Sequence, residues 1–154
     1  MSKLNLIIYI ALLVIVDYLI KGYASAHLNP FETIQFLPFL NFYLTSNTGI
    51  AFSMFDFGSG LSSYILLIIA VAIVIFLIQQ LLNETRKLSQ VGFIFIIGGA
   101  LGNIIDRAGD GAVTDFLHFY INNFSFFIFN PADAFITIGA LMLIYSEFRK
   151  TSNV

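Results

Sequence analysis

The chain has 154 residues, of which 58% are hydrophobic and only 10% are charged. Because soluble domains contain about 25% charged residues, this composition predicts an integral membrane protein. The length suits one domain, residues 1–154. A net charge of −2 without basic clusters argues against nucleic acid as a partner.

Four apolar stretches approach the length of about 20 residues that a membrane-spanning helix requires. We expect spans at about residues 4–23, 61–82, 90–106 and 131–148. The third span is short and glycine-rich, and its GGALG segment indicates close helix packing, not a phosphate-binding loop. The first span has an alternative interpretation as a cleavable signal peptide, because Lys3 precedes it and Ala24-Ser25-Ala26 resembles a cleavage site. Its length and the presence of Asp17 favour a retained helix.

The basic residues predict how the spans are oriented. Five of them lie before the first span, between the second and third, and after the fourth: Lys3, Arg86, Lys87, Arg149 and Lys150. Because basic residues accumulate on the cytoplasmic side, we expect both termini in the cytoplasm. Two longer connections, at about 24–60 and 107–130, then face outward. Their segments TIQFLPFLNFYLTS and FSFFIFN are typical of short strands or an amphipathic surface element, and we expect them to pack on the membrane surface.

The polar residues gather at the outer ends of the spans. They are Asp17 and Lys21 in the first span, Asn47 in the first outer connection, Asn103, Asp106 and Arg107 in the third span, Asp115 in the second outer connection, and Asn130 and Asp133 at the start of the fourth span. Charges within a membrane are costly and are rare unless they serve a function. Their shared depth therefore predicts a site built between the helices.

Simpler structural interpretations of these residues remain open at this point. Asp17 and Lys21 are four residues apart on one helical face, a spacing that predicts a structural ion pair. Asp106 and Arg107 are adjacent in sequence and are most simply interpreted as an ion pair at the membrane interface. In the segment Asn130-Pro131-Ala132-Asp133, Asn130 suits an N-cap, and Asp133 suits the positive end of the helix.

The residue types that are missing restrict the chemistry. Cysteine is absent, which excludes a thiol nucleophile and a cysteine metal site. The two histidines, His27 and His118, are far apart in sequence and do not make a zinc ligand set, so we expect no metal and no cofactor. His118 is interpreted as an interfacial side chain and not as a base. Carboxylates are the main ionisable groups left for chemistry.

Five motifs in chain order make the chain resemble one family. They are VDYLIK at 16–21, SNTGIAFSMF at 46–55, GGALGNIIDR at 98–107, GAVTDF at 111–116 and FNPADA at 129–134. Together, and on this topology, they resemble signal peptidase II, the lipoprotein signal peptidase family of bacteria. Pro131 and Thr114 stand where that family commonly has an aliphatic residue and a second valine.

The resemblance implies a fold and an activity. The fold is an all-α membrane core of four transmembrane helices, with a small β-cradle and a surface helix from the two outer connections. The activity is that of an intramembrane aspartic endopeptidase, which cuts diacylglyceryl-modified prolipoproteins just before the lipidated cysteine. The expected setting is the bacterial cytoplasmic membrane, with the site near its outer face. Membrane lipid and peptide-like inhibitors of the globomycin type are further expected partners, and we expect a monomer.

The resemblance also assigns roles to residues. Asp115 and Asp133 match the catalytic pair. Residues expected to bind substrate or support the site are Asp17, Lys21, Asn47, Gly49, Asn103, Asp106, Arg107 and Asn130, and Gly49, Ala51 and Phe52 match a segment that covers the substrate. Two nearby carboxylates do not readily ionise together, so they are expected to share one proton and activate a water.

Three other functions remain as alternatives. A small proton-coupled transporter would explain acids in a membrane, but it predicts polar groups near the midplane and an inverted repeat. A non-catalytic scaffold does not require two aspartates to meet. A Ser–Lys peptidase would use Lys21 with a serine such as Ser25, one turn away.

Overall fold

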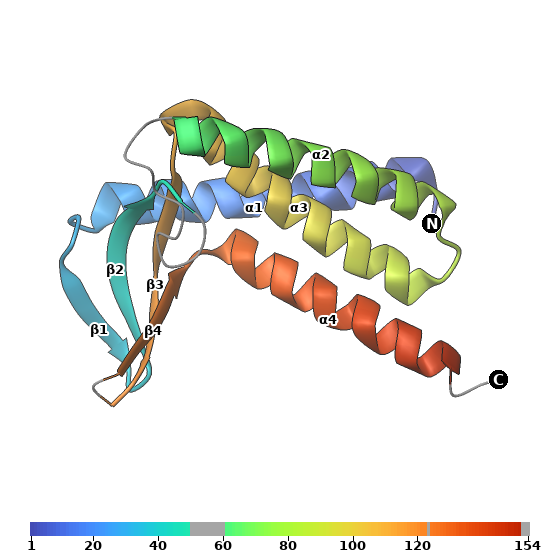
Figure 1. The fold of residues 1–154 in the computed structure, drawn as a ribbon. Coiled ribbons are helices and arrows are strands. Elements are labelled where there is room, and N and C mark those ends of the chain that lie inside the picture. The colour runs from blue at the N-terminus through green and yellow to red at the C-terminus, as the bar shows by residue number, and fades with distance from the viewer. Residues whose placement is uncertain (50–60, 123, 152–154) are drawn as a thin grey trace.

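The computed structural model describes residues 1–49, 61–122 and 124–151. Its elements are α1 (Lys3–His27), β1 (Thr33–Leu37), β2 (Leu40–Asn47), α2 (Leu61–Asn83), α3 (Lys87–Asp110), β3 (Val113–Ile121), β4 (Phe124–Phe129) and α4 (Pro131–Thr151). The helices form a bundle, and the four strands stand together at one end of it (Figure 1). All four helices are long and apolar enough to cross a membrane, which confirms the four predicted spans.

The helices extend beyond the predicted spans, most of all α3, which was predicted at 90–106 and begins at Lys87. It ends where Gly111 takes a left-handed backbone conformation, with φ of 73°, and its N–H bonds the carbonyl of Arg107. At the other end of the bundle, Ser2 caps α1 by accepting the N–H of Asn5. Apolar length identifies the part of a helix that fits the membrane, whereas caps determine where the helix stops.

The helix α3 packs against each of the other helices. The main buried cluster joins Leu6 of α1, Val74 and Leu81 of α2, and Ile94 and Ile97 of α3. On its other side α3 makes its most extensive contact with α4. A side chain that projects from α3 can therefore reach α1 or α4, depending on its position around the helix.

Glycines allow the close approach of α3 and α1, as the GGALG segment predicted. A Cβ atom at Gly98 would lie 2.8 Å from the Cβ of Leu13 in α1. One turn later, a Cβ at Gly102 would meet the carboxylate of Asp17. The absence of both side chains leaves room for Asp17 at the helix interface.

The strands form one antiparallel sheet in the order β1-β2-β3-β4. This confirms strands in both aromatic segments, while β3, which contains the VTDF motif, was not predicted. The surface helix implied by the resemblance has no counterpart among the described residues outside the spans, which do not include 50–60. It stays a prediction.

The sheet has one aromatic face and one more polar face. Pairs such as Phe42 with Leu117 and Phe119 with Phe127 lie on the aromatic face. Side chains alternate along a strand, so Asp115 lies on this same face of β3, two residues before Leu117. The opposite face carries His118, whose Nε2 is 2.7 Å from the hydroxyl of Ser125. The sheet therefore directs Asp115 and His118 to opposite sides.

The α1 helix packs against the sheet as well as against α3. It continues through Ala24, Ser25 and Ala26, and Ala24 is buried with Leu44 and Phe116. That this helix is retained and not cleaved as a signal peptide stays a prediction from the sequence.

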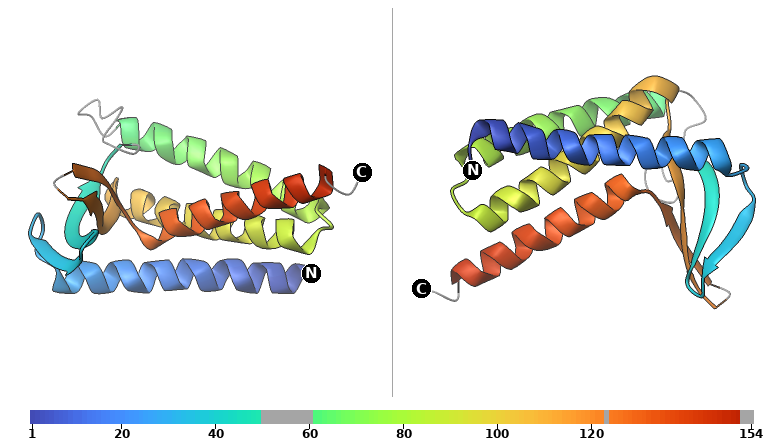
Figure 2. Two further views of the ribbon diagram at one scale, coloured as in Figure 1. Left: turned by 90° about the horizontal axis from the view of Figure 1, so that it is seen from below. Right: turned by 180° about the vertical axis from the view of Figure 1, so that it is seen from behind.

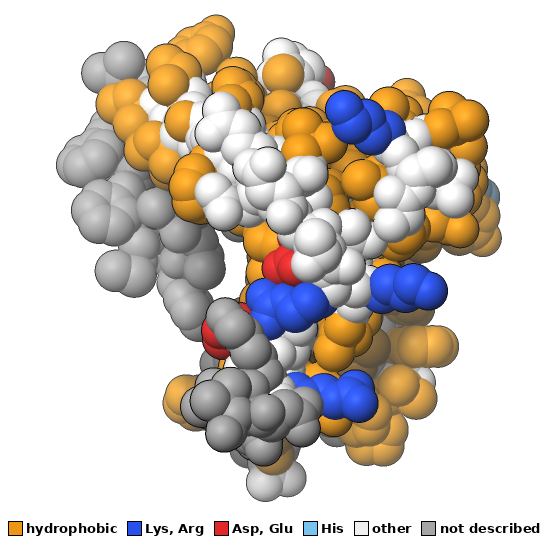
Figure 3. Space-filling model, turned by 90° about the vertical axis from the view of Figure 1, so that its right-hand side faces the viewer, with side chains coloured by type: hydrophobic (Ala, Val, Ile, Leu, Met, Phe, Trp, Pro, Cys, Tyr) orange, Lys and Arg blue, Asp and Glu red, His pale blue; other side chains and the backbone are white. Residues whose placement is uncertain are grey.

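The end of the bundle opposite the sheet is basic. The start of α1 and the end of α4 lie at this end (Figure 2), and Lys and Arg side chains gather on it (Figure 3). The basic residues of this end include Lys3 at the start of α1, Arg86 and Lys87 at the start of α3, and Arg149 near the end of α4. Arg86 pairs with Glu84 at 3.0 Å and with Glu147 at 2.9 Å, which joins the α2–α3 connection to α4.

The glycine contact at α1 can be tested with a matched pair of variants. We expect Gly98→Ala to destabilise the protein by about 1–3 kcal/mol, because the added methyl group overpacks against Leu13. Gly22→Ala places the same change where nothing lies within 4 Å of the new Cβ. It should not destabilise, because alanine favours helix over glycine by about 1 kcal/mol. Thermal melts in detergent compare the two, and equal effects would contradict the packing account.

Candidate active site

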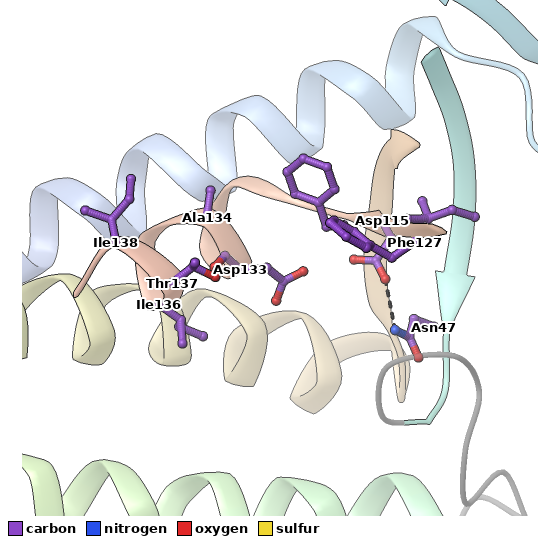
Figure 4. A pocket seen from close by; sticks show the side chains of 10 residues that line it. Asn47, Asp115, Phe127, Asp133, Ala134, Ile136, Thr137 and Ile138 are labelled. Atoms are coloured by element: carbon purple, nitrogen blue, oxygen red, sulfur yellow. Dashed lines mark hydrogen bonds between the residues drawn. The ribbon is translucent and has the colours of Figure 1, made fainter. Parts of the chain in front are cut away.

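Asp115 and Asp133 come together from different elements. Asp115 lies near the start of β3, and Asp133 lies in the first turn of α4. Figure 4 shows both side chains entering the same space. They line a cavity of about 620 Å³ next to β4 and α4, and also a second cavity of about 250 Å³ next to α2 and α3. The two residues that the sequence singled out for catalysis thus lie in one site.

Asp115 is buried, with 3% of its surface exposed. The amide of Asn47 donates to its Oδ2 at 2.9 Å, and the amide of Asn130 donates to its Oδ1 at 2.6 Å. Burial raises the pKa of Asp115 to about 6; the hydrogen bond from Asn47 opposes this rise, and the nearby charge of Asp133 adds to it. Asp115 therefore holds a proton more tightly than an ordinary aspartate does.

Asp133 both starts α4 and belongs to the site. Its backbone N–H donates to Oδ1 of Asn130 at 3.1 Å, and its Oδ2 accepts the backbone N–H of Asn130 at 3.2 Å. This reciprocal pair is a capping box with Asn130 as N-cap. The remaining oxygen, Oδ1, accepts the amide of Asn103 at 2.9 Å. The helix-start interpretation from the sequence was therefore correct, and it does not compete with a role in the site.

Lys21 lies at the centre of a buried polar network beside the aspartates. Its Nζ is 2.8 Å from Asp17 and 3.1 Å from Asp106, and it donates to Oδ1 of Asn103 at 2.9 Å. An ammonium only donates hydrogen bonds, so it fixes the Asn103 amide with its oxygen toward Lys21 and its NH₂ toward Asp133. Lys21 thus orients Asp133 through Asn103.

The two acidic partners of Lys21 hold the backbone beside the two site aspartates. Asp17 accepts the N–H of Ala132, the residue before Asp133, at 2.9 Å. Asp106 accepts the N–H of Thr114, the residue before Asp115, at 3.1 Å. One ammonium, through two carboxylates, therefore ties down the chain next to Asp133 and next to Asp115.

Arg107 has a different partner from the one that the sequence suggested. The predicted pair of Asp106 with Arg107 is wrong, because adjacent helical residues point about 100° apart. Asp106 faces Lys21, whereas Arg107 Nη2 donates to the carbonyl of Gly49 at 2.9 Å. The Gly49 N–H donates to Oδ1 of Asn47 at 3.1 Å, so the end of β2 is tied to α3 beside the smaller cavity.

A family model described as "Signal peptidase (SPase) II" matches residues 9–149. The chain belongs to the signal peptidase II family. It is 41% identical over 137 residues to a lipoprotein signal peptidase of Yersinia pseudotuberculosis serotype O:1b. This match covers 88% of the chain and 81% of the relative. It is 40% identical over 150 residues to one of Bartonella bacilliformis, covering 96% of this chain and 89% of the relative.

Solved structures resemble the signal peptidase II fold described above. One, titled "Bacterial membrane enzyme structure by the in meso method at 2.3 A resolution", superposes with a TM-score of 0.85 at 29% identity, over 98% of this chain and 92% of that chain. Another, titled "Bacterial membrane enzyme structure by the in meso method at 1.9 A resolution", gives a TM-score of 0.82 at 29% identity, over 94% of this chain and 92% of that chain. The chain is thus a multi-pass membrane peptidase, and the transporter alternative gains no support.

The sequence singled out the polar residues of this candidate site and missed the apolar residues that line it. Each predicted site residue lies in the network or lines a cavity, while Ala51 and Phe52 are outside the described residues. The second span was interpreted as packing only, yet four of its residues line the smaller cavity at spacings of three, one and three: Leu66, Ile69, Ala70 and Ile73. Their helical spacing was the only sequence feature that could have indicated a cavity wall. It cannot be recognised in a span whose residues are apolar on every side of the helix.

His118 and Lys21 are not placed for the other chemistries that the sequence left open. His118 lies on the opposite face of β3, which agrees with its interpretation as an interfacial side chain. Lys21 is engaged by two carboxylates, so it does not have the free amine that a Ser–Lys peptidase requires. Among the described residues, no group of three His, Cys, Asp or Glu side chains is placed to hold a metal ion.

The Lys21 network predicts a large stability effect. Lys21→Met leaves Asp17 and Asp106 without their buried counter-charge, and breaking a buried ion pair in this way costs about 3–5 kcal/mol. Lys87→Met removes a lysine from the far end of α3 and should change stability by less than about 0.5 kcal/mol. Thermal melts of both variants in the same detergent test this. A Lys21→Met protein as stable as the Lys87→Met control would mean that the network carries little stability.

Proposed function

We propose that the chain is an aspartic endopeptidase that removes the signal peptide from diacylglyceryl-modified prolipoproteins, cutting just before the lipidated cysteine. The observation that carries this proposal is the meeting of Asp115 and Asp133 in one pair of cavities. The substrate follows from the family, whose curated relatives are named lipoprotein signal peptidases. The chain contains no cysteine, and the polar side chains that meet in these cavities supply an acid pair.

The hydrogen bonds leave this pair free to hold a water. Each of the four carboxylate oxygens of Asp115 and Asp133 accepts one amide N–H, from Asn47, Asn103 or Asn130. A carboxylate oxygen has two lone pairs, so one per oxygen remains for water or for a shared proton. The asparagines therefore fix the acids without using up their capacity to react.

The reaction then follows from the shared proton. The ionised aspartate takes a proton from water, and the resulting hydroxide adds to the scissile carbonyl carbon. The protonated aspartate donates to the carbonyl oxygen as that oxygen becomes negative. When the C–N bond breaks, a proton passes to the amine of the lipidated cysteine, and the signal peptide leaves as a carboxylic acid. The roles belong to the pair, because coupled acids titrate together.

The supporting residues take positioning roles in this proposal. Lys21, Asp17 and Asp106 hold the backbone beside the acids, and Asn103 orients Asp133. Arg107 holds the Gly49 segment at the edge of the smaller cavity and offers a charged donor toward the peptide. A single well-placed donor to a developing oxyanion contributes about 3 kcal/mol.

The membrane setting is part of the same proposal. The basic end of the bundle lies in the cytoplasm, and the sheet and the aspartates lie at the outer face of the bacterial cytoplasmic membrane. Exposed side chains on or beside the aromatic face, such as Phe36 and Phe127, suit the boundary between the headgroups and the acyl chains. Water reaches the acids from outside, while the lipid chains of the substrate stay in the bilayer. A monomeric state and binding of globomycin-type inhibitors stay predictions of the family resemblance.

The catalytic assignment predicts a clear loss of activity. Asp115→Asn and Asp133→Asn should each abolish cleavage of a lipidated prolipoprotein, measured by gel shift, while the purified proteins still fold and melt cooperatively. Asp110→Asn, at the exposed end of α3, is the matched control and should retain activity. Full activity in either of the first two variants would exclude the aspartic mechanism. No cleavage by folded wild type on several lipidated substrates would exclude the proposed function.

The pKa of Asp115 predicts a pH dependence. Because that pKa is about 6, raising the pH through this value removes the shared proton, and kcat/KM should fall. Asn47→Ala removes a hydrogen bond that favours the ionised form, so the pKa should rise and the fall should move to higher pH. Asn83 lies at the end of α2 that is far from the aspartates, and its amide donates to the carbonyl of Gln79. As the control, Asn83→Ala should leave the pH dependence of kcat/KM unchanged. Profiles that coincide for Asn47→Ala and wild type would contradict this assignment.

A further inference from the structure

The aspartates lie between two cavities of unequal size. The larger, about 620 Å³, is lined by β4 and the first two turns of α4, and the smaller, about 250 Å³, by α2, α3 and the end of β2. Asn47, Asp115 and Asp133 line both. In Figure 4, α2 runs below the aspartates, whereas Ala134 and Ile138 lie above them. A peptide bond held at the aspartates therefore has one cavity on each side.

One wall of the smaller cavity is a face of α2 on which a second helix could pack. The α2 residues Leu66, Ile69, Ala70 and Ile73 follow one another at helical spacing, so they form a single stripe along the helix. Its centre is the small residue Ala70. Small residues in such a stripe let a second membrane helix approach closely. The segment that a signal peptidase releases is itself an apolar stretch in the membrane.

The larger cavity has a different wall. Phe127 and Phe129 of β4 face Ala134, Ile136 and Ile138 of α4 across it. The ring of Phe127 is 5.5 Å from that of Phe129 and 5.4 Å from that of Phe119, so this wall continues into the aromatic face of the sheet. Phenylalanine side chains at a membrane surface are buried at the boundary between the headgroups and the acyl chains, where the glycerol of a lipid also lies.

The two volumes also point to different occupants. Cavities that enclose a small molecule measure about 300–1,000 Å³, a range that includes the larger cavity and excludes the smaller one. The larger space suits a glyceryl group with the start of its acyl chains. The smaller space suits the side chains of one peptide segment beside a helix.

We propose that the diacylglyceryl group of the substrate cysteine occupies the cavity between β4 and α4, and that the signal peptide packs on the Leu66–Ile73 stripe of α2. The scissile bond then crosses the aspartates from the α2 side to the β4 side. This proposal rests on the proposed function and adds the direction in which the substrate binds. After cleavage, the lipidated product leaves along the aromatic face of the sheet and the signal peptide leaves beside α2.

Photocrosslinking tests the direction. Ile73→p-benzoylphenylalanine on α2 and Ile138→p-benzoylphenylalanine on α4 are each made in the Asp115→Asn protein, so that a lipidated prolipoprotein binds without being cut. Mass spectrometry then identifies which part of the substrate is attached. Attachment of the signal peptide at position 73 and of the acylglycerol at position 138 is expected. The reverse pattern, or the same part of the substrate at both positions, would overturn the proposal.

A kinetic comparison tests the α2 stripe separately. Ala70→Leu fills the centre of the stripe and should lower kcat/KM for a lipidated prolipoprotein by about tenfold. Ala72→Leu adds the same atoms to an exposed position on another side of α2 and should change kcat/KM less than about twofold. Thermal melts confirm that both variants fold. Equal kinetics of the two variants would overturn the role of the stripe.

The two proposals fail in different ways. If wild type does not cleave lipidated prolipoprotein, the proposed function itself is wrong. If wild type cleaves and the crosslinks are reversed, only the direction of binding is wrong.

Discussion

The two aspartates keep their relative positions because a single amide, that of Asn130, binds both of the elements that carry them. Its oxygen caps α4 at the N–H of Asp133, and its nitrogen donates to Asp115 on β3. Asn130 is completely buried in the short link between β4 and α4. The start of the helix and the assembly of the acid pair are therefore one event. A change at Asn130 that frees the helix start also removes one of the two amide hydrogen bonds to Asp115.

The buried ion pairs of Lys21 likewise serve two purposes. Two acids in a buried site repel one another, and desolvation adds to the cost of ionising them. Lys21 supplies a nearby positive charge, and its partners Asp17 and Asp106 bind the backbone beside Asp133 and Asp115. Charge compensation and backbone geometry thus come from one set of bonds. The close approach of α1 and α3, which Gly98 and Gly102 permit, brings Asp17 into this set.

The features that the sequence predicted well are those that depend on local properties. The spans follow from apolar length, the Asp17–Lys21 pair from helical spacing, and the cap at Asn130 from residue type. The features that it missed depend on the rotation of elements about their axes or on their pairing. Asp106 turns to Lys21 instead of to Arg107, and β3 is stabilised by partners far away in sequence. In α2, apolar residues on every side concealed the stripe that lines a cavity.

The central claim is that Asp115 and Asp133 form one acid pair that holds a single proton until the pH rises through about 6. Infrared difference spectra of the purified protein in detergent, recorded as the pH is raised from about 4 to about 8, test it most directly. The account predicts a protonated-carboxyl band that disappears with an apparent pKa near 6 and is missing from the Asp115→Asn variant. A spectrum without such a band, or the same band in that variant, would contradict it.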